Sequence, residues 1–71
     1  MKWKNLTARE VIRILKDDGW FQVGSRGSHL YFKHLSKPGK ISVPVHKKET
    51  LKPKTIRSIF MHARLLKPEE E

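Results

Sequence analysis

The chain has 71 residues, and its 16 Lys and Arg against 7 Asp and Glu give a formal charge of +9. This length excludes a multidomain enzyme, and the absence of Cys excludes disulfides, thiolate zinc sites and cysteine nucleophiles. The first residues lack an apolar signal segment, and no apolar run is long enough to span a membrane. We therefore expect one soluble, cytoplasmic domain over residues 1–71, ordered from about residue 3 to 67, with a solvated acidic tail at 68–71.

The first predicted element is a helix that begins after Thr7. Thr7 can cap it, and Glu10 stands three residues later, as the acid of a capping box does. Gly19 supplies the left-handed residue that ends such a helix. The apolar positions that follow helical spacing are Ala8, Val11, Ile12, Ile14 and Leu15.

Three strands are predicted next, at 20–23, 28–34 and 41–45, separated by Gly-rich and Pro-containing turns. Trp3, Trp20 and Phe21 are interpreted as packing residues. Pro44 cannot donate a ladder hydrogen bond, so the third strand is expected at a sheet edge or bulged there. The side chains that alternation directs inward are Leu30, Phe32, Ile41, Val43 and Val45.

A second helix is predicted from Pro53, because proline suits the first helical turn. Its apolar positions are Ile56, Ile59, Phe60 and Ala63. The order α-β-β-β-α predicts an α+β fold, in which a three-stranded antiparallel sheet carries both helices on one face. The other face stays open, and alternation assigns it His29, Tyr31, Lys33 and Ser42.

The segment Gly27-Ser28-His29 is the main candidate site. An imidazole can take or give a proton near neutral pH, and RNA brings its own nucleophile, the 2′-hydroxyl. His29 can therefore serve as the base or the acid of RNA cleavage, while Arg26 or Lys33 offsets negative charge that develops at the phosphate. From residue types alone, a surface histidine without a role is the commoner interpretation.

Further basic and aromatic residues can bind RNA. Tyr31 can stack on a base, and Arg9 and Arg13 can contact phosphates, although a solvated helix face is an equal alternative. His46 is a second candidate for catalysis or phosphate binding, with a structural role at the strand end equally open. Lys47 and Lys48 follow it in a basic segment. No metal site or other cofactor is expected, because the four histidines and the scattered acids match no ligand spacing.

Four segments together resemble the HicA (YcfA-type) toxin family. They are Gly19-Trp20, Arg26-Gly27-Ser28-His29, Val43-Pro44-Val45-His46 and Leu51-Lys52-Pro53 through Ile56-Arg57-Ser58-Ile59, in the family's order between about Leu6 and Leu65. The resemblance implies a fold like the double-stranded RNA-binding domain and a metal-independent mRNA endoribonuclease that arrests translation. It also implies that His29 is catalytic and that an acidic HicB-type antitoxin neutralises the toxin.

The chain departs from the family pattern at its second helix. Lys54 stands where many relatives have Gly, and Ala63-Arg64-Leu65 stands where they tend to have Ala-Gly-Leu. Three functions remain as hypotheses: the ribonuclease, a non-catalytic double-stranded RNA-binding module and a DNA-binding domain. The DNA-binding domain ranks last, because the sequence shows no helix-turn-helix spacing. Incubation with RNA separates the first two, since only the ribonuclease cuts.

Overall fold

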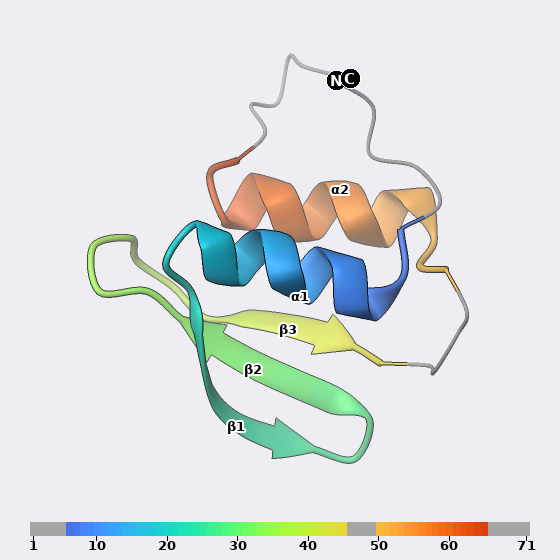
Figure 1. Cartoon of the computed structure of the whole chain (residues 1–71), viewed down its shortest axis with the longest axis horizontal. Helices are drawn as coiled ribbons and strands as arrows, with labels where there is room; N and C mark the ends of the chain where they lie inside the picture. Colours follow the sequence, from blue (N-terminus) through green and yellow to red (C-terminus); the bar gives the residue numbers. More distant parts are fainter. Residues whose placement is uncertain (1–5, 46–49, 66–71) are drawn as a thin grey trace.

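The computed structural model describes residues 6–45 and 50–65. Its elements are α1 (Ala8–Asp17), β1 (Phe21–Arg26), β2 (His29–Lys33), β3 (Ile41–Pro44) and α2 (Pro53–His62). Both helices lie on the same side of the sheet (Figure 1). This order confirms the α-β-β-β-α prediction and is consistent with the fold of the double-stranded RNA-binding domain. Trp3, His46, Lys47, Lys48 and the acidic tail at 68–71 lie outside the described residues.

Helix α1 begins and ends as its sequence predicts. The Thr7 hydroxyl accepts from the Glu10 backbone N–H at 3.3 Å, and the Glu10 carboxylate accepts from the Thr7 N–H at 2.8 Å. This reciprocal capping box satisfies donors that the first helical turn leaves unpaired. At the other end Gly19 has a φ of 102°, and the Trp20 N–H donates to the Leu15 carbonyl at 3.0 Å.

The sheet has the order β1-β2-β3, with antiparallel pairing throughout, so β2 is the central strand. The edge position of β3 confirms the inference from Pro44. The prediction that the first strand ends at Val23 is wrong, because β1 continues to Arg26. A register shift between Gln22 and Gly24 absorbs one extra residue, so the following residues still pair with β2.

Gly27 and Ser28 form the two-residue connection between β1 and β2. Gly27 has a φ of 59°, a conformation that glycine adopts without steric cost at the first position of a tight hairpin turn. The turn places Arg26 directly opposite His29. The local geometry of the candidate motif is therefore set by this glycine.

The core lies between the helices and the sheet. Its largest fully buried side chains include Trp20 from the approach to β1, Phe32 from β2 and Phe60 from α2. Leu30 and Val45 pack against this core as partly buried residues, as their strand positions predict. Phe21 does not join it. The expectation that Phe21 is a packing residue is wrong, since 43% of it is exposed.

The C-terminal ends of the two helices have the same hydrogen-bond pattern but different residues. In α2 the Leu65 N–H donates to the Phe60 carbonyl at 2.8 Å, as the Trp20 N–H does in α1. The left-handed position, occupied by Gly19 after α1, is occupied after α2 by Arg64, with a φ of 60°. The departure from Ala-Gly-Leu thus leaves the helix end formed, with a strained residue in it.

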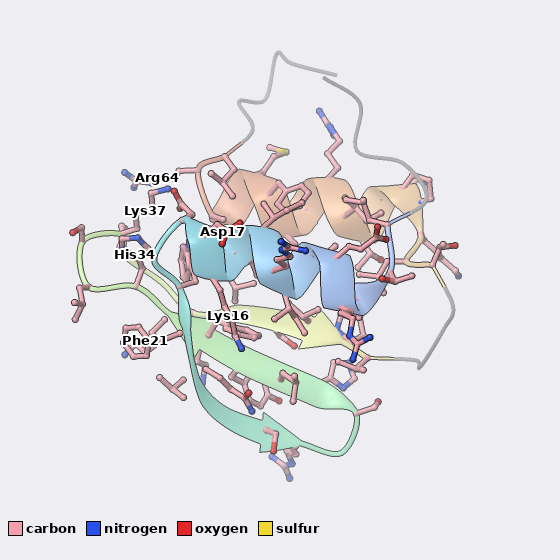
Figure 2. All side chains as sticks on the ribbon, viewed as in Figure 1. Lys16, Asp17, Phe21, His34, Lys37 and Arg64 are labelled. Atoms are coloured by element: carbon pink, nitrogen blue, oxygen red, sulfur yellow. The ribbon has the colours of Figure 1, made fainter. Side chains whose placement is uncertain are left out.

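A polar cluster joins the end of α1 to the loop after β2, and we call it the His34 clasp. It comprises His34, Asp18, Lys37 and Trp20, and it reaches the Ala63 carbonyl at the end of α2. The Lys37 ammonium pairs with the Asp18 carboxylate and donates to the Ala63 carbonyl at 2.9 Å. Figure 2 shows His34, Lys37 and Arg64 gathered near the end of α1. Three separate parts of the chain are held together there.

Candidate functional site

One face of the sheet is turned away from both helices, and we call it the open face. In an antiparallel sheet, directly paired residues project to the same side, and alternate residues of a strand project to opposite sides. Phe32 and Val43 are buried under the helices. The neighbouring positions His29, Tyr31 and Lys33 therefore belong to the open face, as the alternation pattern predicts.

His29 lies at the beginning of β2, in the middle of a row across this face. Arg26 of β1 is paired with it on one side and Pro44 of β3 on the other. His29 and Arg26 are both exposed. Within the part of the chain that the structure describes, the His29 imidazole has no hydrogen-bond partner. The arrangement leaves an accessible imidazole beside a guanidinium, which is suited to a phosphodiester.

The backbone next to His29 is accessible at the hairpin turn. A Cβ added at Gly27 or at Gly24 would meet no atom within 4 Å, so a phosphate can approach the chain there. Ser28 is exposed beside this turn. Its carbonyl accepts from the Val45 N–H at 2.7 Å, which fixes the turn against β3.

Tyr31 and Lys33 continue the open face along β2. Tyr31 is half-buried, Lys33 is exposed, and Tyr31 has Gly24 and Ser42 as its cross-strand partners. The Lys40 ammonium lies 5.0 Å from the centroid of the Tyr31 ring, in a cation–π contact. Sequence reasoning missed Lys40 as a site residue because it lies in a turn. Its position immediately before β3 is the signal that could have placed it near the face.

The described residues of the open face carry charge of one sign. Arg26, Lys33 and Lys40 are its cations. The acids in the described part of the chain are Glu10, Asp17 and Asp18, which belong to α1 and its C-terminal cap. Because no described acid lies on this face, no described carboxylate offsets its positive charge, and the face attracts a polyanion.

The structure separates the arginines of α1 from His29. Arg9 and Arg13 are exposed on α1, which packs on the opposite side of the sheet. Arg9 lines a hollow of about 700 Å³ between α1 and the helix side of the sheet, together with Thr7, Ile12, Lys16, Gln22, Leu30 and Val45. An RNA contact of these arginines remains a prediction, and such a contact would lie on the helix side of the molecule, apart from the open face.

The other described histidines have structural contacts. His34 binds the Asp18 carbonyl at 2.7 Å and belongs to the clasp. His62 is exposed on α2, and its Nδ1 donates to the Ser58 carbonyl at 2.8 Å. Residues 6–45 and 50–65 contain no group of three or more His, Asp or Glu that could hold a metal ion. In the same ranges no helix is long and apolar enough to cross a membrane.

Fold and site together define a small α+β protein that carries a histidine on a basic, open sheet face. A family model described as the HicA toxin of bacterial toxin-antitoxin matches residues 8–65. The chain belongs to this family of toxins of toxin–antitoxin systems, which confirms the resemblance seen in its motifs. No curated protein matches the chain with significant similarity.

A solved structure supports this assignment. The chain is similar to one chain of a toxin–antitoxin complex from Streptococcus pneumoniae, with 26% identity and a TM-score of 0.72. The match covers 84% of this chain and 98% of the other. The two chains therefore share their fold over nearly the whole length of the solved one.

Proposed function

We propose that the chain is an mRNA-cleaving toxin in which His29 transfers the proton during cleavage. The observation that carries the proposal is the accessible His29 imidazole beside Arg26, on a face whose described charges are all positive. Membership of a toxin family supports the same interpretation. The site thus combines a group that moves protons with charges that attract a polyanion.

The reaction needs no nucleophile from the protein. The 2′-oxygen of RNA attacks the adjacent phosphorus, and the bond from phosphorus to the 5′-oxygen breaks, which leaves a 2′,3′-cyclic phosphate and a free 5′-hydroxyl. His29 either takes the proton of the 2′-hydroxyl or gives one to the departing 5′-oxygen. Arg26, and Lys33 further along the strand, stabilise the added negative charge of the pentacoordinate phosphorus. His46 remains a candidate for the second proton-transfer role.

A protein partner is the other half of the proposal. The similar chain from Streptococcus pneumoniae belongs to a toxin–antitoxin complex. We propose that an acidic HicB-type antitoxin covers the open face and the basic segment that includes Lys47 and Lys48. Opposite charges favour such a complex, and burial of the face excludes RNA.

The decisive test is the replacement of His29 by Ala or Gln. Loss of a proton-transfer group should slow cleavage of RNA by about 10²–10⁴-fold and abolish growth arrest. His62→Ala is the matched control, because His62 is also exposed but lies on α2. Cleavage should persist in EDTA and leave 2′,3′-cyclic ends.

Two outcomes contradict the proposal. Cleavage that survives in the His29 variants at the rate of the unmodified chain would remove His29 from the mechanism. An unmodified chain that binds RNA without cutting it would leave the non-catalytic RNA-binding module as the function.

A further inference from the structure

Phe21 occupies a position that folding does not explain. It is paired with Lys33, so its ring projects from the open face. Its neighbour Trp20 is only 2% exposed and fills the core, whereas 43% of Phe21 is accessible to solvent. Figure 2 shows the Phe21 side chain projecting from the beginning of β1, clear of both helices. An aromatic ring that projects from the same face as the candidate site is accessible to a ligand.

Tyr31 is a second ring on the same face. It lies diagonally across from Phe21 in the β1–β2 pairing, a relation in which residues are about 7–8 Å apart and within reach of aromatic side chains. His29 is two residues from Tyr31 on the same strand, about 6–7 Å away. Phe21, Tyr31 and His29 thus follow one another across the open face.

Cations accompany the two rings. Lys33 is paired with Phe21, the Lys40 ammonium lies over Tyr31, and Arg26 is paired with His29. Aromatic side chains among cations are the usual arrangement for single-stranded nucleic acid, because the bases stack on the rings and the backbone follows the charges. A duplex hides the faces of its bases, so the rings would gain little from it.

We propose that the open face binds unpaired RNA, with Tyr31 stacking on a base next to the bond that is cut and Phe21 stacking on a base further along the strand, about 13 Å from His29. The position of the cut rests on the proposed function, whereas the stacking does not. Lys40 leaves the Tyr31 ring when a base arrives, because a cation–π contact at an exposed site is weaker than base stacking. The freed ammonium then binds a phosphate. The substrate class is single-stranded, although the fold resembles a reader of double strands.

The test measures binding in a His29→Ala background, so that no substrate is consumed. Fluorescence anisotropy compares a short, unstructured, fluorescein-labelled RNA with the same strand annealed to its complement. Phe21→Ala should weaken binding of the single strand by about 5- to 100-fold and of the duplex by less than about two-fold. Because binding is measured without cleavage, a failure of the proposed ribonuclease activity does not affect this result.

Three further variants separate stacking from other effects. Phe21→Leu keeps an apolar side chain without a π-face and should bind as weakly as Phe21→Ala, whereas Phe21→Trp should bind at least as tightly as the unmodified residue. Leu35→Ala is the matched control, since Leu35 is 91% exposed in the β2–β3 connection, and it should change neither affinity. An unchanged single-strand affinity in Phe21→Ala would overturn the proposal and leave Phe21 as a protein-docking residue. Equal losses for single strand and duplex would also overturn it.

Discussion

The two ends of β2 carry the same residue type in opposite circumstances. His34 follows the strand, and both of its ring nitrogens are engaged: Nε2 with the Asp18 carbonyl at 2.7 Å, and Nδ1 with the Ser36 and Lys37 N–H groups at 2.9 and 3.2 Å. His29 begins the strand, is exposed, and has no such partner in the described part of the chain.

This difference separates a structural imidazole from the one that we propose to be reactive. Backbone N–H groups only donate and a carbonyl only accepts, so in these contacts Nδ1 of His34 accepts and Nε2 donates. These three hydrogen bonds hold the His34 ring in one orientation. The exposed His29 ring has no such partner in the described part of the chain, so it is accessible to a ligand.

Gly19→Ala should have the largest effect on stability, because Gly19 lies against His34, the residue that follows β2 and belongs to the clasp. A Cβ at Gly19 would lie 2.7 Å from His34 Nε2, and the φ of 102° is unfavourable for any residue with a side chain. Displacement of His34 and backbone strain together should cost about 3 kcal/mol of unfolding free energy. For a domain of this size that lowers Tm by roughly 12 °C or more, measured by circular dichroism.

Gly24→Ala is the control for this prediction. Gly24 has no positive φ, and a Cβ there would meet no atom within 4 Å. The Tm of the Gly24→Ala variant should stay within about 3 °C of the Tm of the unmodified chain. If both variants lose the same stability, the contact between Gly19 and His34 is not the cause.

Local sequence signals predicted most of the fold. The Thr7 and Glu10 capping pair, the glycine stop at Gly19 and the alternation in β2 each depend on residues close together in sequence. The same alternation placed His29 on the open face. These features are predictable because capping and strand periodicity are local effects.

Long-range pairing explains what sequence reasoning missed. The clasp joins His34 to Asp18, residues 16 positions apart, which no local pattern encodes. The extension of β1 to Arg26 depends on a bulge that only the pairing with β2 reveals. Phe21 was assigned to the core by its residue type, yet the register with Lys33 places it outside.

Replacement by Ala should destabilise the fold at His34 and leave its stability nearly unchanged at His29. His34→Ala removes three hydrogen bonds and an edge-on contact with Trp20, whose ring centroid lies 5.3 Å away. The expected loss is about 2–3 kcal/mol of unfolding free energy, measured by urea denaturation. His29→Ala should change that free energy by less than about 0.5 kcal/mol, because the residue is exposed. Equal losses of unfolding free energy in the two variants would contradict the distinction between a structural His34 and an exposed His29.

Arg64→Gly should produce the smallest change among the variants expected to alter stability, and the change should be stabilising. Arg64 adopts the left-handed conformation beside the Ala63 carbonyl that the clasp binds through Lys37. Glycine adopts this conformation without the steric cost, although it also adds freedom to the unfolded chain. The net gain should be about 0.5–1 kcal/mol, read as a rise in Tm of roughly 2–8 °C. Arg64→Ala removes the same side chain but keeps the strain, so it should show no such rise. A gain in both variants would assign the effect to the arginine's charge.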